Sequence, residues 1–218
     1  MRLLLLTSCL VLAACGGAPR STPEVMLGVA AEFVAVYNDW DAPRAAALFA
    51  GDSAKRASKL QKHFAWLEDQ LGACGAPQYM YSTSNRGARY NFACERGSLE
   101  TWIKLDKAGK IFKMSSGATG VAAPPDLQEA ASDVVASMPL SACRKPKFQT
   151  NLTAGWPHDL GACTLGRPWV FGNHAGLFHV TCEGEKTAVL GVRVDKQGKL
   201  VRANLVKGEH YIYQDPRV

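Results

Sequence analysis

Apolar residues recur at helical spacing in the first third of the chain. In residues 25–50 they mark one helix face, at Val29, Phe33, Val36 and Tyr37. Asp41 followed by Pro43 predicts that a second helix begins there and runs through Phe49. We expect Asp52 or Ser53 to cap a third helix that ends at Gly72 and carries one apolar stripe, Leu60, Phe64, Leu67 and Leu71.

Alternation with a period of two replaces the helical spacing after residue 78. Tyr90, Phe92 and Cys94 share one face of the second predicted strand. Residues 107–110 form a turn sequence that leads into the last strand of the set. We therefore expect an antiparallel meander with strands at residues 79–83, 88–94, 101–105 and 111–114.

The second half of the chain repeats this order with less helix. The pattern predicts one helix over residues 126–138 and strands near residues 169–171, 177–182, 188–194 and 200–206. Between the helix and the strands, Pro139, Pro146 and Pro157 interrupt any helical pattern. We therefore expect the counterpart of the third helix to be shortened or lost.

Three sequence blocks recur in the same order at an offset of nearly 89 residues. LGAC at 71–74 returns at 160–163, CERG at 94–97 is echoed by CEG at 182–184, and LDKAGKI at 105–111 returns as VDKQGKL at 194–200. A duplication explains this better than a solenoid, which needs about three or more units. The predicted fold class is α+β, with two tandem copies of helices packed on a four-stranded antiparallel meander. We place a first helix-plus-sheet module at residues 25–118, a second at 126–218 and a proline-containing linker at 119–125.

The first fourteen residues have the composition of a secretory signal. Arg2 precedes an apolar run at residues 3–12, which is shorter than the ~20 apolar residues of a membrane span. The ending LAAC at residues 12–15 resembles the lipobox of bacterial lipoproteins. That resemblance implies cleavage before Cys15, attachment of a diacylglycerol to its sulfur and acylation of its new amino group. We expect a signal peptide at 1–14 and a lipidated tether at 15–24, with an ordinary secretory signal that contains a cysteine as the alternative.

A protein anchored in this way is expected in the bacterial cell envelope. Gly16, rather than an aspartate, follows the predicted lipidated cysteine, which resembles the sorting pattern of outer-membrane lipoproteins that face the periplasm. Removal of Arg2 leaves 24 basic and 19 acidic residues, a net charge of +5. This modest excess favours anionic surfaces such as lipid headgroups. The predicted partners are the membrane, through the N-terminal lipid, and an envelope protein or glycan; no nucleic-acid partner is expected.

Five cysteines remain in the chain after the signal and the lipidation site. An exported chain reaches an oxidising compartment, so disulfides are expected. The repeat places Cys74 and Cys163 just after the helical part, and Cys94 and Cys182 on the apolar face of a strand. We therefore predict the disulfides Cys74–Cys94 and Cys163–Cys182, each pinning the helical layer to the strands. Cys143 is left over, and a bond from Cys143 to Cys163 is the alternative.

The residues form no recognised catalytic motif. Neither G-x-S-x-G nor S-x-x-K occurs, and the five histidines are scattered without the spacing of zinc ligands. We therefore expect no catalytic residue, no metal and no cofactor. Asp39 with Tyr37 and Tyr90 is the set that an isomerase-like pocket could use. Helix capping by Asp39 and Asp41 is the competing interpretation.

Four segments of the first module are FVAVYNDWD (33–41), AAALF (45–49), LEDQLG (67–72) and KLDKAGKI (104–111). Together they resemble the nuclear-transport-factor-2-like α+β superfamily, also called ketosteroid-isomerase-like or cystatin-like. The resemblance implies a cone-shaped pocket in the first module. The second module has a shorter helical part, which argues against a complete pocket of this kind there. The tandem layout with one cysteine pair in each copy is also faintly similar to the β-lactamase-inhibitory proteins.

These features predict a non-catalytic, lipid-anchored envelope protein that acts as a binding or scaffold module. Two alternatives stay open. A small-ligand carrier, or an isomerase-like or hydrolase-like enzyme, would need a pocket in the first module. An inhibitor or partner of a cell-wall enzyme would present an exposed concave sheet lined with aromatic residues.

Overall fold

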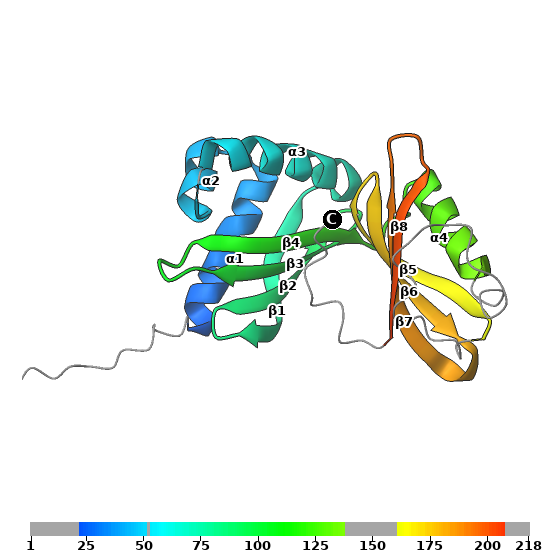
Figure 1. The fold of residues 1–218 in the computed structure, drawn as a ribbon. Helices are drawn as coiled ribbons and strands as arrows, with labels where there is room; N and C mark the ends of the chain where they lie inside the picture. Colours follow the sequence, from blue (N-terminus) through cyan, green and yellow to red (C-terminus); the bar gives the residue numbers. More distant parts are fainter. Residues whose placement is uncertain (1–21, 52, 138–160, 208–218) are drawn as a thin grey trace, which may run out of the picture.

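The computed structural model describes residues 22–51, 53–137 and 161–207, and its elements follow the predicted order (Figure 1). Three helices come first: α1 (Pro23–Asn38), α2 (Ala42–Leu48) and α3 (Ser53–Leu71). The Thr22 hydroxyl accepts from the Val25 amide at 3.3 Å and caps α1. The Asp41 carboxylate accepts from the Arg44 amide at 2.7 Å and caps α2, because the first amides of a helix have no partner within it.

Four strands follow in an antiparallel meander: β1 (Cys74–Ser84), β2 (Gly87–Cys94), β3 (Gly97–Leu105) and β4 (Ile111–Thr119). We call α1–α3 and β1–β4 the first unit. The predicted strand positions were right, but β1 and β4 each extend several residues beyond the predicted limits. Their additional residues include Pro77 and Gly117, which a strand pattern does not favour, and pairing with β2 and β3 holds them in the sheet.

The second unit has the same sheet and, among the described residues, less helix. It comprises α4 (Pro125–Ser137) and the strands β5 (Cys163–Gly172), β6 (Ala175–Cys182), β7 (Lys186–Val194) and β8 (Leu200–Lys207), with a short 3-10 turn η3 (Glu183–Glu185). The predicted α+β class, with two units of helices on four antiparallel strands, is therefore confirmed.

The repeat is visible in the detail of its turns. The Asp106 carboxylate accepts from the amides of Ala108 and Lys110 at 2.8 and 2.9 Å, between β3 and β4. The Asp195 carboxylate accepts from the amides of Gln197 and Lys199, both at 2.9 Å, between β7 and β8. Each turn also contains a glycine with positive φ, +80° at Gly109 and +75° at Gly198. A side-chain acceptor and a left-handed glycine thus fold the same turn twice.

The eight strands form one sheet in the order β1 to β8, a continuity that the sequence did not predict. The units join where β4 pairs with β5, through Ala118↔Val170 and Thr119↔Trp169. Ala118 belongs to the buried cluster of the first unit and Val170 to that of the second. Both clusters, and the helices that complete them, therefore lie on the same face of the sheet.

Both disulfides expected from the repeat are present, but the predicted link between layers is wrong. Cys74–Cys94 and Cys163–Cys182 each join directly opposed residues of neighbouring strands, with Cα atoms 3.9 Å apart. The reason is that β1 and β5 begin at the cysteine itself, two residues after the glycine that follows the helical part. Each bond therefore closes the open end of a hairpin. Cys15 and Cys143 lie outside the described residues.

Candidate binding surface

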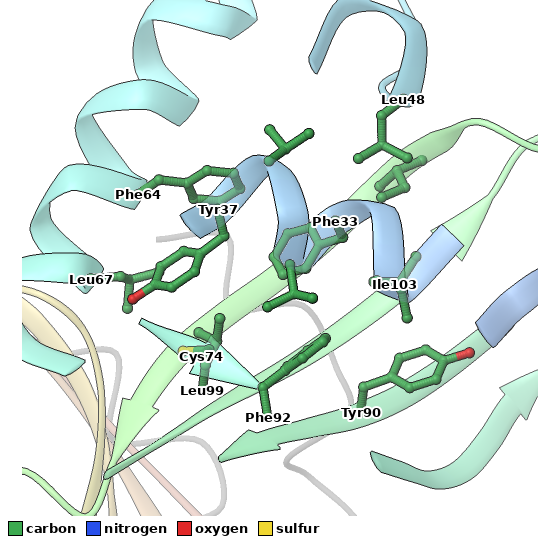
Figure 2. Close-up of a cluster of buried hydrophobic side chains, with 14 of the residues drawn as sticks. Phe33, Tyr37, Leu48, Phe64, Leu67, Cys74, Tyr90, Phe92, Leu99 and Ile103 are labelled. Carbon is green, nitrogen blue, oxygen red and sulfur yellow. The ribbon is translucent and has the colours of Figure 1, made fainter. Parts of the chain in front are cut away.

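The helix-facing interior of the first unit is filled by side chains. Phe64 of α3 contacts Phe33 edge-on, with ring centroids 5.4 Å apart, and Tyr37, at 5.8 Å. Phe33 also meets Phe92 of β2 at 5.8 Å (Figure 2). Phe33, Phe92 and Leu67 are fully buried. The space in which the family resemblance placed a pocket is therefore occupied by an aromatic core.

The residues considered for an isomerase-like pocket do not come together as a site. Asp39 is exposed at the C-terminal end of α1, and Asp41 caps α2. The Tyr37 hydroxyl donates to the Gly72 carbonyl at 2.9 Å, and burial raises the pKa of Tyr37. Burial also raises the pKa of Tyr90 to about 12. The capping interpretation holds for Asp41, and both phenols are protonated parts of the core at neutral pH.

A polar row crosses the buried face of β2, β3 and β4 that meets this core. Tyr90, Thr101 and Ser116 stand opposite one another in the strand register. His63 of α3 lies above the row, with its Nε2 2.9 Å from the Ser116 hydroxyl. A serine beside an imidazole is the beginning of a nucleophilic pair. Ser116 is only 3% exposed, however, so a substrate from solvent has no route to its oxygen.

The opposite face of the sheet, which we call the outer face, carries an ion pair and an indole where the two units meet. Arg89 of β2 donates to the Glu100 carboxylate at 2.7 Å. The Arg89 guanidinium also lies 4.4 Å from the centre of the Trp169 ring of β5. A Cβ at Gly117 would collide with that indole, so a glycine is needed on β4 for the ring to lie flat there. Trp169 therefore packs the second unit onto the outer face of the first.

Away from this junction, the outer face presents partly exposed side chains along both units. In the first unit these include Asn91, Trp102 and Ser115, and in the second Phe171, Leu177, His179, Arg193 and Arg202. The Trp102 indole nitrogen donates to the Thr83 hydroxyl at 2.8 Å, which fixes the orientation of the ring. The described helices pack against the other face (Figure 1). The outer face therefore combines partly exposed aromatic side chains with exposed charged groups, a combination found in protein interfaces.

The sequence allowed an exposed sheet lined with aromatic residues, but the residues of this face were not identified from it. On β3, Leu99, Thr101 and Ile103 point to the core, and the residues between them form the outer row. Glu100, Trp102 and Lys104 were thus available from the same alternation. That all eight strands would share one such face depended on the β4–β5 pairing, for which the sequence gives no signal.

A groove of about 380 Å³ opens at the end of the first unit where α1 begins. It lies between the first turn of α1 and the end of the β1–β2 hairpin and is lined by Pro23, Met26, Tyr79, Ser82, Thr83, Ser84, Asn85, Gly87 and Ala88. Apart from the Tyr79 phenol, its polar atoms are small hydroxyl, amide and backbone groups. Among the described residues that line the groove there is therefore no carboxylate, imidazole or lysine amine for acid–base chemistry.

Other candidate chemistry is scattered or lies outside the described residues. Within residues 22–51, 53–137 and 161–207, no group of three metal-ligating side chains comes together, and His174 and His179 are both exposed. Over the same residues no helix has both the length and the apolar composition that crossing a bilayer requires. His158 and His210 are not among the described residues.

Comparison with known proteins leaves the fold without a family. No protein-family model matches the chain, and no curated protein is significantly similar to it. The resemblances noted from the sequence therefore remain resemblances, and what the structure itself shows is an α+β protein with two helix-plus-four-strand units and two disulfides.

Proposed function

We propose that this protein is a non-catalytic, lipid-anchored envelope protein that binds a protein partner through the outer face of its sheet. The observation that carries the proposal is the contrast between the two faces. The helix-facing side is packed with buried aromatic and aliphatic residues. The outer face is free of described helices and carries partly exposed aromatic residues and exposed charged groups.

The junction gives this face a rigid centre. Arg89 and Trp169 are only 3% and 6% exposed, and the Arg89–Glu100 pair fixes the guanidinium under the indole. Trp102 is held by its hydrogen bond to Thr83. Arg89 and Trp169 are buried and support this face from below, whereas Trp102 is partly exposed on it. An aromatic ring held in one orientation loses little conformational entropy on binding, and such rings often dominate the affinity of an interface.

An inhibitor or partner of a cell-wall enzyme is the more specific version of this proposal. Its support is the single eight-stranded sheet with aromatic residues on the helix-free side and one disulfide in each unit. The envelope location rests on the LAAC ending at residues 12–15, and the two disulfides are consistent with an extracytoplasmic compartment.

Site-specific photocrosslinking in cells tests the binding face. A photoreactive phenylalanine analogue at Trp102 or at His179 is expected to crosslink to a discrete partner band, because both side chains lie on the outer face. The same analogue at Lys59, exposed on α3 of the helical side, is the matched control. Equal crosslinking at Lys59 and Trp102, or none at the two outer positions, would contradict the proposal.

The anchor is tested separately. Cys15→Ser is expected to block processing and to move the protein out of the membrane fraction, and the mass of the purified parent protein should include the acyl chains. Unchanged processing and fractionation of Cys15→Ser would remove the anchor from the proposal without affecting the binding face.

A further inference from the structure

Basic side chains gather at the end of the first unit where α1 begins. The register Gly87↔Lys104 and Lys104↔Lys113 places the ends of β2, β3 and β4 side by side. The groove described above places the first turn of α1 against the β1–β2 turn at this same end. In Figure 1 the start of α1 and the β1–β2 and β3–β4 turns lie together at one extremity of the molecule. We call this region the α1 end.

The charge of the α1 end is strongly positive. Its turns and strand ends carry five cations, Arg86, Lys104, Lys107, Lys110 and Lys113. Lys107, Lys110 and Lys113 are exposed. Among the described residues, two acidic side chains, Glu24 and Asp106, lie at this end. Five cations against two carboxylates leave an excess of three positive charges there.

Exposed apolar side chains lie near the groove at this same end. Val25 in the first turn of α1 is 49% exposed, and Tyr79 and Met80 on the edge strand β1 are 53% and 44% exposed. They are among the few large apolar residues with high exposure in the described part of the chain. A surface that combines exposed apolar residues with uncompensated cations has the chemistry of a peripheral contact with an anionic bilayer.

The position of the predicted lipidation site supports the same partner. Six residues lie between Cys15 and Thr22, the first described residue, so the seven chain steps from one to the other span at most about 25 Å. A bilayer that holds the lipid on Cys15 is therefore within that distance of the α1 end. The second unit begins after β4 and lies further from the start of α1 along the sheet (Figure 1).

We propose that the α1 end docks onto an anionic lipid bilayer through its lysines and the exposed apolar residues near the groove. For its orientation the inference rests on the proposed lipid anchor. Docking would keep the body against the membrane instead of leaving it free on its tether. It would also leave the second unit and most of the outer face accessible to a partner in the aqueous phase.

The duplication supplies a matched control. The residues 89 positions after Lys107, Lys110 and Lys113 are Lys196, Lys199 and Arg202, which are also exposed and lie on the same turn of the second unit. Reversing either set of three charges changes the net charge of the protein by the same amount. Only the first set lies at the α1 end.

The test measures binding of the chain from residue 15 onward, with Cys15→Ser so that no acyl chain is attached, to vesicles of phosphatidylglycerol and phosphatidylethanolamine. The parent protein is expected to bind these vesicles, to bind phosphatidylcholine vesicles weakly, and to be released by salt. Lys107→Glu/Lys110→Glu/Lys113→Glu should weaken binding by at least about tenfold. Lys196→Glu/Lys199→Glu/Arg202→Glu should retain most of it. Circular dichroism checks that both variants are folded.

Three results would overturn the inference: no binding of the parent protein to anionic vesicles, equal loss in the two triple variants, or a larger loss in the second-unit variant. Val25→Ser/Met80→Ser gives an independent readout, because it leaves the charge unchanged and should still reduce binding severalfold. Since the protein in this experiment carries no lipid, a failure here is distinguishable from a failure of Cys15 processing.

Discussion

In the first unit, three helices lie over β1–β4, and six aromatic residues belong to the buried cluster between them, Phe33, Tyr37, Phe49, Phe64, Tyr90 and Phe92. In the second, α4 lies over β5–β7, and Phe178 is the one aromatic residue of the buried cluster within the described residues. The strand order, the turns and the disulfide are nevertheless the same. The same four-stranded sheet can therefore form under different sets of helices, because strand pairing uses backbone groups and does not depend on the helices packed on the sheet.

The end of α3 shows how one substitution accompanies this difference. The Arg96 guanidinium donates to the carbonyls of Glu68, Asp69 and Gln70 at 2.6–3.1 Å, and these belong to the last turn of α3. Those carbonyls have no partner inside the helix, and a cation is favourable there. Gly184 is the second residue after Cys182, as Arg96 is the second residue after Cys94. The second unit has thus lost the side chain that would support such a helix.

The largest expected effect separates the two cores. Phe64→Ala removes the ring that contacts Phe33 and Tyr37, and should lower the free energy of unfolding by about 3–5 kcal/mol. Phe178→Ala, at a fully buried site of the second unit, is the matched change. Hydrogen exchange should show protection lost mainly in β2 for the first variant and mainly in β6 for the second. Equal loss in both strands would mean that the units unfold together and that their cores are not separate.

The disulfides test whether the two hairpins are equivalent. Replacing both cysteines of either pair by alanine should cost roughly 3 kcal/mol, because the loops of 20 and 19 residues are nearly the same length. Chemical denaturation of the Cys74→Ala/Cys94→Ala and Cys163→Ala/Cys182→Ala proteins measures this. A difference of more than about 1.5 kcal/mol between them would show that the helical cover, and not loop closure, determines what each bond contributes.

The glycines after the helical part give a smaller, paired effect. Gly72 and Gly161 have φ of +72° and +64°, and an added Cβ would press against the side chains of Glu95 and Glu183 respectively. Gly72→Ala and Gly161→Ala should each cost about 1–2 kcal/mol, since alanine strains this backbone conformation. Gly28→Ala, where a Cβ meets open space within α1, is the control and should be neutral or stabilising. The denaturant midpoints of the three variants measure these effects; the midpoints of Gly72→Ala and Gly161→Ala should lie below that of Gly28→Ala.

The smallest effect belongs to His63, a residue of the first unit only. Burial lowers its pKa below the ordinary value of 6.5, and its contact with Ser116 opposes this in part. The unfolded chain therefore binds the proton first as the pH falls, so the stability present above about pH 6.5 should decline as the pH drops below it. The loss between pH 7.5 and 5.5 should not exceed about 1.4 kcal/mol, which is the limit for one histidine that stays neutral in the folded protein.

Urea unfolding at several pH values measures this dependence in the parent protein and in His63→Gln. The variant should show a flatter decline, and His179→Gln, at an exposed position of the second unit, should not. An unchanged slope in His63→Gln would assign the pH dependence to other groups.

Local chemistry allowed most of the elements to be predicted. Asp41 before Pro43 marked the start of α2, Gly72 marked the end of α3, and the alternation around Tyr90 and Phe92 located β2. The repeat then extended each prediction to the second unit and paired the cysteines correctly. Helix starts, helix ends and strand alternation depend on residues a few positions apart, so they can be predicted from the sequence alone.

The tertiary structure alone decided what the elements form together. It joined the units through β4 and β5, placed each disulfide between adjacent strands, and filled the expected pocket around Phe64. It also put Trp169 against Arg89, some eighty residues earlier in the chain. Such contacts depend on which faces meet after the strands pair. Spacing along one chain fixes the face of each residue but not the partner that covers it.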